Sequence, residues 1–208
     1  KDLIVATKLA PYPWRLGRQG FKAAFNASKA RLQGKLDRVQ LHWSTARYLP
    51  WQEVQLIDGL GDLYENGLIS QIGISNMGPN RLLWFHRRLQ MRGIPLKSIQ
   101  IQFSLLSPGA SRYLAIHNIC QEKNIELLAY SPLALGVLGI SPQETKIPKS
   151  TLLRCNLFRR LLPSSIQLRN ELSKIAIERG VSQAQVALNW CRAHDAMPIA
   201  GLRNPKQA

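Results

Sequence analysis

The segment ISQIGISNMGPNRLLWFHRRLQMRGIPLKSIQIQF, residues 69–103, contains two short apolar runs separated by one longer stretch. Residues 69–74 and 98–103 have the length and β-branched content of buried strands. Residues 80–91 instead repeat apolar positions at the period of a helix. A strand, a helix and a second strand form a unit in which the strands run parallel, because a parallel pair needs a crossover that is usually a helix. The segment therefore predicts a parallel α/β fold.

The same alternation extends in both directions along the chain. Strands are predicted over residues 3–7, 39–43, 125–130 and 196–200, and helices over 18–35, 51–65, 111–123, 165–179 and 182–194. Residues 133–163 break the pattern and predict a long loop. The alternation leaves two architectures open, a doubly wound sheet and a (β/α)₈ barrel. Since such a barrel needs eight strands and six are counted, we expect a segment of a larger chain.

Composition places the chain among folded proteins with a very basic surface. Its 208 residues include 28 Lys or Arg against 12 Asp or Glu, a formal net charge of +16, and 45% are hydrophobic. That hydrophobic fraction excludes a disordered basic tail, which could not bury enough apolar surface. We expect one domain over residues 1–208, since domains contain roughly 100–200 residues. Neither a membrane span of about 18 apolar residues nor a signal peptide is expected.

Cysteine and charge patterns limit the compartment and the partners. Cys120, Cys155 and Cys191 are scattered, which favours neither a disulfide framework nor a metal site, and no metal is expected. This pattern suits a reducing, cytoplasmic environment. The basic residues are spread along helices and loops without interleaved aromatic residues, so we do not expect a nucleic-acid partner. Attraction to anionic ligands and acidic partners is the expected consequence of the charge.

Polar residues follow most of the predicted strands. They are Lys8, His42, Ser75, Asn76, Gln100, Tyr130, Ser131 and Gly201. Ligands of parallel α/β folds bind at the carboxyl ends of the strands. A lysine, a histidine and an amide pair at that edge are suited to polarising a carbonyl and binding an amide-bearing ligand. Taken singly, each also fits a structural interpretation: a solvated lysine, a buried histidine, or a tyrosine in the core. Trp14 follows the first strand and is a candidate substrate contact.

Six short motifs in a fixed order narrow the choice. They are Ala-Thr-Lys-Leu (6–9), Leu-His-Trp (41–43), Gly-Ile-Ser-Asn (73–76), Ala-Tyr-Ser-Pro-Leu (129–133), Gln-Val-Ala-Leu-Asn-Trp (185–190) and Pro-Ile-Ala-Gly (198–201). In this order the chain resembles the aldo-keto reductase family, and most of all its cyanobacterial and plastid branch. The resemblance implies an α/β fold, a (β/α)₈ TIM barrel of which this chain holds strands 3 to 8 only. It also implies NADPH/NADP⁺ as cofactor and the reduction of an aldehyde or ketone by hydride transfer. The compartment it implies is the cytoplasm, or the plastid stroma if the protein comes from a plant or alga.

The resemblance assigns the catalytic roles. Lys8 corresponds to the lysine that lowers the pKa of the family's catalytic tyrosine, since a nearby cation favours the phenolate. His42 corresponds to the histidine that orients the substrate carbonyl. The catalytic tyrosine and the aspartate that pairs with the lysine come from strands that precede this chain. The alternative is therefore a catalytically impaired cofactor-binding or scaffold protein, and a basic adaptor for polyanions is a weaker one.

The cofactor-binding residues are likewise implied by the resemblance. Ser75, Asn76 and Gln100 correspond to residues that bind the nicotinamide carboxamide, and Tyr130 to the ring that stacks on the nicotinamide. Ser131 and Leu133 lie in the stretch that holds the pyrophosphate. Gly201, Arg203 and Gln207 belong to the loop that receives the adenosine phosphate, where Arg203 would pair with a 2′-phosphate. Leu202 departs from the pattern, because many family members have a polar residue there.

Overall fold

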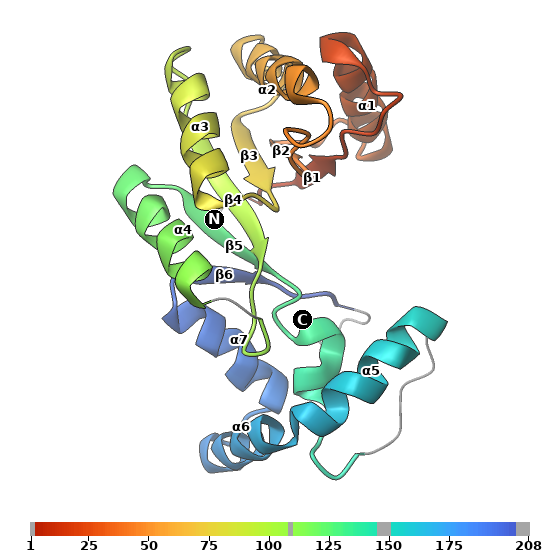
Figure 1. The fold of residues 1–208 in the computed structure, drawn as a ribbon, viewed down its shortest axis with the longest axis vertical. Coiled ribbons are helices and arrows are strands. Elements are labelled where there is room, and N and C mark those ends of the chain that lie inside the picture. Colours follow the sequence, from red (N-terminus) through yellow and green to blue (C-terminus); the bar gives the residue numbers. More distant parts are fainter. Residues whose placement is uncertain (1–2, 108–109, 145–150, 203–208) are drawn as a thin grey trace. The chain divides into compact units, whose positions relative to one another are not determined.

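The computed structural model describes residues 3–107, 110–144 and 151–202 and has an α/β fold (Figure 1). Its strands are β1 (Ala6–Leu9), β2 (Arg38–Leu41), β3 (Gln71–Ser75), β4 (Leu96–Gln102), β5 (Glu126–Tyr130) and β6 (Ala196–Ile199). Its helices are α1 (Gly17–Arg31), α2 (Pro50–Glu65), α3 (Pro79–Gln90), α4 (Ala110–Lys123), the short 3₁₀ helix η1 (Ala134–Gly139), α5 (Leu152–Ser164), α6 (Ile166–Arg179) and α7 (Gln183–Ala193). The alternation predicted from the sequence is confirmed.

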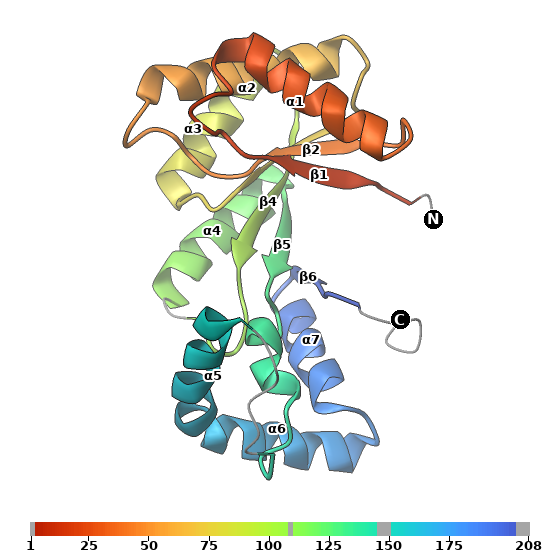
Figure 2. The same cartoon turned by 90° about the vertical axis from the view of Figure 1, so that its right-hand side faces the viewer.

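The hydrogen-bonding order of the strands follows their order in the chain, from β1 to β6. The pairings β1–β2, β2–β3 and β3–β4 are parallel, with Lys8 opposite Gln40, Gln40 opposite Gly73 and Gly73 opposite Ser98. Figure 2 shows β1 and β2 side by side. Sequential parallel strands joined by helices are the arrangement that a β-α alternation dictates.

The chain divides into two compact units. The first contains residues 1–101 and 109–127, and the second contains residues 102–108 and 128–208. The first unit carries β1 to β3 with α1 to α4 and most of β4. The second carries η1, α5, α6, α7 and β6, and the boundary passes through β4 and β5.

The core of the first unit forms where the apolar sides of α1, α2 and α3 meet the strands. Among its fully buried side chains are Phe21, Phe25, Leu56, Leu60, Ile72, Ile74, Leu82 and Phe85. The aromatic residues of α1 recur every four positions, so they lie on one side of that helix. This spacing explains why α1 packs against α2.

The second unit corrects one prediction. Residues 133–163, expected as a loop, contain η1 and α5. Both helices are held by a shared apolar cluster, in which Val137 and Leu138 of η1 pack with Phe158 and Leu162 of α5. The local sequence pattern did not predict α5, because a helix in a protein gains most of its stability from tertiary packing rather than from its intrinsic propensity.

Helix α7 begins where the sequence predicts. Ser182 is its N-cap: the hydroxyl accepts from the Gln185 backbone N–H, and the Gln185 side chain accepts from the Ser182 N–H, which is a capping box. At the other end of the chain, the strand predicted over residues 3–7 is displaced. Pairing with β2 starts only at Ala6, so Lys8 lies inside β1 rather than after it.

Candidate functional site

Lys8 and Gln100 meet at the carboxyl end of the sheet in the first unit. The Lys8 ammonium donates to Gln100 Oε1 over 3.2 Å, although 92 residues separate them. Gln100 is only 3% exposed, and Lys8 keeps contact with solvent. Partial burial of the ammonium lowers the pKa of Lys8 below its ordinary value. The fold thus holds a cation beside a buried amide.

His42 follows β2 directly, and its backbone N–H donates to the Leu9 carbonyl at 3.1 Å. This bond fixes His42 beside the end of β1, near Lys8. Burial of the imidazole and, second, the positive charge of Lys8 lower the pKa of His42 below its ordinary value. The neutral imidazole is therefore favoured, and it presents one N–H donor and one acceptor nitrogen.

Asn76 connects three strand ends. Its backbone N–H donates to the Gln100 carbonyl at 2.9 Å, and its Nδ2 donates to the His42 carbonyl at 3.1 Å and to Ser75 Oγ at 3.2 Å. The residue has φ 59°, a left-handed conformation that Asn adopts more readily than most residues. The structure therefore gathers Lys8, His42, Ser75, Asn76 and Gln100 in one place, as the carboxyl-end argument predicts.

The donors and acceptors of this group match a carboxamide. Gln100 and Asn76 carry side-chain amides, each with two donor hydrogens and an acceptor oxygen, and Ser75 adds a hydroxyl. A primary amide ligand has the same complement, so it can exchange hydrogen bonds with this set in both directions. The nicotinamide carboxamide has this chemistry, and the residues present fit it.

An aromatic cluster beside His42 was largely missed from the sequence. The Trp43 ring lies 4.9 Å from the His42 ring, and the Tyr12 ring lies 5.7 Å from that of Trp43. Trp14, the predicted substrate contact, stacks on Tyr12 at 4.6 Å and is 73% exposed. Trp43 Nε1 donates to the Tyr48 hydroxyl at 2.8 Å. The sequence signal was present, because all four residues lie in the two segments that follow β1 and β2.

In the second unit, Tyr130 ends β5 and its carbonyl accepts from the Phe103 N–H at 3.3 Å. Ser131, the next residue, has φ 52°, and Ala134, Leu135 and Gly136 also have positive φ. Non-glycine residues in this conformation cost free energy and cluster at functional sites. Leu133 accepts the Gly136 N–H through its carbonyl and packs against the apolar cluster of η1 and α5. The pyrophosphate segment predicted from the resemblance therefore has an unusual backbone.

The last predicted site residues lie after β6. Gly201 and Leu202 are exposed, and Leu202 has 57% of its surface accessible. Arg203 and Gln207 lie outside the described residues. Their proposed contact with the adenosine phosphate stays a prediction.

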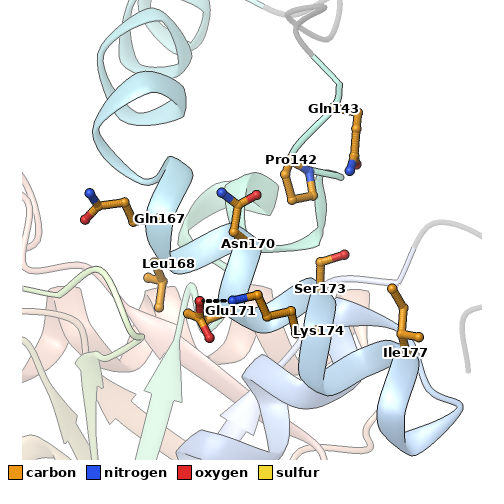
Figure 3. A pocket seen from close by; sticks show the side chains of 9 residues that line it. All are labelled: Pro142, Gln143, Gln167, Leu168, Asn170, Glu171, Ser173, Lys174 and Ile177. Carbon is orange, nitrogen blue, oxygen red and sulfur yellow. Dashed lines mark hydrogen bonds and ion pairs between the residues drawn. The ribbon is translucent and has the colours of Figure 1, made fainter.

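A hollow of about 660 Å³ in the second unit is separate from these residues (Figure 3). It is lined by Pro142, Gln143, Gln167, Leu168, Asn170, Glu171, Ser173, Lys174 and Ile177. Figure 3 shows Glu171 and Lys174 paired along α6, at 2.7 Å, and both side chains are exposed. None of the predicted site residues lines it, so we assign it no role.

Over residues 3–107, 110–144 and 151–202, no group of three or more His, Cys, Asp or Glu side chains is arranged to hold a metal ion. In the same part of the chain, every helix is too short or too polar to cross a bilayer.

Known proteins resemble this chain in sequence and in fold. The model of the aldo/keto reductase family matches residues 1–208. The chloroplastic pyridoxal reductase of Arabidopsis thaliana is 47% identical over 204 residues, which cover 98% of this chain and 55% of that protein. The aldo-keto reductase yakc of Schizosaccharomyces pombe, whose name specifies NADP(+), is 26% identical over 164 residues, 73% of this chain and 45% of that protein. The chain thus spans about half the length of the curated relatives it matches.

Among solved structures, the glycerol dehydrogenase of Gluconobacter oxydans superposes with a TM-score of 0.75 at 25% identity. The match covers 92% of this chain and 57% of that one. It confirms the predicted α/β barrel fold class and excludes the doubly wound alternative. With a family model matched along its whole length and a plant reductase nearly half identical to it, the chain belongs to the aldo/keto reductase family.

Proposed function

We propose that the complete gene product containing these 208 residues reduces aldehydes or ketones with NADPH. The observation that carries the proposal is the polar group at the carboxyl ends of the strands in the first unit, where Lys8 donates to Gln100 and Asn76 donates to the His42 carbonyl and to Ser75. Membership of the aldo/keto reductase family supports the same chemistry. A reduced nicotinamide, when bound, supplies the hydride.

The residues of this chain would bind and orient the reactants. Ser75, Asn76 and Gln100 would hold the carboxamide and so fix which face of the ring is turned to the substrate. Holding two reactants in a productive geometry is itself worth a large part of a catalysed rate. The bond from Lys8 to Gln100 would tie the cationic group to the same framework.

Lys8 and His42 would act on the carbonyl oxygen and its proton. A neutral His42 can donate an N–H to that oxygen without adding a second positive charge beside Lys8. Lys8 would favour the ionised form of the proton donor, a tyrosine that the resemblance expects outside this chain. General acid catalysis of this kind contributes roughly 10²–10⁴-fold to the rate.

For the substrate we propose an aromatic aldehyde of the pyridoxal type. The Trp43 ring lies against His42, and the Tyr12 and Trp14 rings extend the cluster from Trp43; such rings stack well on a planar ligand. The name of the Arabidopsis relative points to the same substrate.

We further propose a preference for NADPH over NADH, since Arg203 and Lys206 would neutralise the additional phosphate. The compartment proposed is the cytoplasm, or the plastid stroma in a plant or alga, as the name of that relative suggests.

The test measures NADPH oxidation by the complete gene product with pyridoxal, with a benzaldehyde and with a short aliphatic aldehyde. We expect turnover with the aromatic aldehydes and tighter binding of NADPH than of NADH in fluorescence titrations. Lys8→Met should lower kcat by at least about 100-fold. Lys22→Met, at an exposed position on α1, is the matched control and should leave kcat unchanged. Tight NADPH binding without turnover would instead support the scaffold alternative.

A further inference from the structure

Glu53 is a buried carboxylate that the proposed chemistry does not use. It lies in the first turn of α2 and is 1% exposed. Glutamate is almost never fully buried unless it is paired, because removing a charge from water is costly. The N-terminal end of a helix favours negative charge, which offsets part of that cost. The remaining stabilisation must come from specific partners.

The two oxygens of Glu53 bind two different elements. Oε1 accepts from the backbone N–H of Thr45 at 3.2 Å, in the loop between β2 and α2. Oε2 forms an ion pair with the Arg81 guanidinium of α3. Arg81 in turn lies over the Trp84 ring, 4.2 Å from its centroid. Glu53, a residue of α2, therefore connects α3 to the loop between β2 and α2.

That loop is tightly constructed around Thr45, which is completely buried. The Thr45 carbonyl accepts from the N–H groups of Tyr48 and Leu49, at 3.0 and 2.8 Å, and Thr45 Oγ1 donates to the Leu49 carbonyl at 3.0 Å. Glu53 holds the N–H of the same residue. The position of Thr45 thus determines the course of residues 45–49.

The loop carries the part of the aromatic cluster closest to His42. Tyr48 accepts a hydrogen bond from Trp43, and the Trp43 ring contacts His42 at 4.9 Å. A chain of contacts consequently leads from Arg81 through Glu53 and Thr45 to the rings that would face the substrate. A displacement of about 1 Å in such a positioning group can cost 10²-fold in rate.

We infer that Glu53, held by Arg81, is a positioning residue that sets Trp43 and Tyr48 for stacking on aromatic carbonyl substrates. The inference rests on the proposed function, because it assigns these rings to the substrate side. It adds the ion pair between Glu53 of α2 and Arg81 of α3 to the determinants of specificity. Neither Glu53 nor Arg81 touches the reacting atoms.

The experiment compares Glu53→Gln with the unmodified gene product, using pyridoxal and a short aliphatic aldehyde. Glutamine keeps the shape and one acceptor oxygen but removes the ion pair. We expect the KM and the equilibrium Kd for pyridoxal to rise about tenfold, with a much smaller change for the aliphatic aldehyde and for the Kd of NADPH. Equal changes for both aldehydes would show a general structural role and overturn the inference.

Two further variants make the result decisive. Arg81→Lys keeps the cation that the buried carboxylate needs, so it should fold even if Glu53→Gln does not, and should give a smaller rise for pyridoxal alone. Glu65→Gln removes another α2 carboxylate, one that pairs with Arg92 and lies outside the loop, and should change neither aldehyde. Binding is measured as well as turnover, so that the proposed function and the role of Glu53 are tested separately.

If the unmodified protein binds pyridoxal without reducing it, the proposed function is contradicted, and the effect of Glu53 on binding is still tested. If it does not bind pyridoxal, both the proposed function and the inference about Glu53 are overturned.

Discussion

Lys8 and His42 illustrate how burial and a neighbouring charge together determine the protonation state of a side chain. Both have a lowered pKa, Lys8 through partial burial and His42 through burial and the charge of Lys8. A protonated imidazole beside the ammonium would bring two positive charges together, so the neutral imidazole is favoured. At neutral pH His42 is thus a neutral donor, suited to polarising a carbonyl oxygen.

Replacing Lys8 tests this electrostatic coupling. In Lys8→Met the positive charge is removed while the surrounding atoms remain, so the pKa of His42 should rise toward its ordinary value of 6.5 and stay below it. The measurement is an NMR titration of the His42 ring protons, assigned with His42→Gln. Lys22→Met should leave the titration unchanged. An unaltered His42 pKa in Lys8→Met would show that burial alone causes the shift.

At the scale of the element, α2 brings carboxylates into contact with arginines of α1, of α3 and of the turn that follows α3. Asp58 and Asp62 lie one turn apart on α2 and both bind Arg18 of α1. Arg88 of α3 donates to both Asp58 oxygens, at 2.9 and 2.8 Å, and Arg92 binds Asp62 and Glu65. The acidic side of α2 therefore links α1 and α3, in addition to their apolar packing.

Asp58 is the best-buried carboxylate of this arginine network, at 8% exposure. In Asp58→Asn the bonds from Arg18 and Arg88 lose their ionic character, and we expect the free energy of unfolding to fall by about 1.5–3 kcal/mol, the range for hydrogen bonds to charged groups. Urea unfolding followed by circular dichroism gives the value. Glu171→Gln on α6 breaks an exposed pair with Lys174 and should have a far smaller effect. Comparable losses in the two variants would contradict the role of burial.

At the scale of the molecule, many acidic residues of the described part of the chain are paired with basic ones, and several of the remaining basic side chains are exposed to solvent. Much of the acidic content is engaged in ion pairs, as with Glu53, Asp58 and Asp62, whereas Lys22 and Lys35 are exposed to solvent. A net excess of positive charge raises the local concentration of anionic ligands. The net charge of +16 thus favours the approach of anionic ligands.

The three cysteines differ in burial, and their reactivity can therefore test the packing of both units. Burial raises the pKa of Cys120 to about 12 and that of Cys191 to about 11, whereas Cys155 on α5 is half-buried. Because the thiolate is the reactive form, iodoacetamide at pH 8 should label Cys155 well before the other two. Peptide mass spectrometry measures the labelling, and in urea all three should react at similar rates. Native labelling of Cys120 or Cys191 as fast as Cys155 would contradict the buried placement.

Much of the fold could be predicted from the sequence because the signals are local. Strand and helix periods are properties of neighbouring residues, and they located β3, α3, β4 and the start of α7 to within about two residues, the usual uncertainty of element ends. Parallel alternation then implied that Lys8, His42, Asn76, Gln100 and Tyr130 would meet at one edge. The structure brings the first four together in the first unit, whereas the place of Tyr130, which lies in the second unit, relative to them stays a prediction.

The sequence by itself determined the β-α alternation, the family resemblance and the edge of the sheet at which the polar residues gather. Only the tertiary structure decided that residues 152–164 form a helix, since α5 depends on apolar contacts with η1. It also decided the pairing of Trp43 with Tyr48 and the partners of Glu53, which come from separate elements. These features rest on contacts between segments distant in the sequence, and the energy of such contacts leaves no periodic signal in either segment alone.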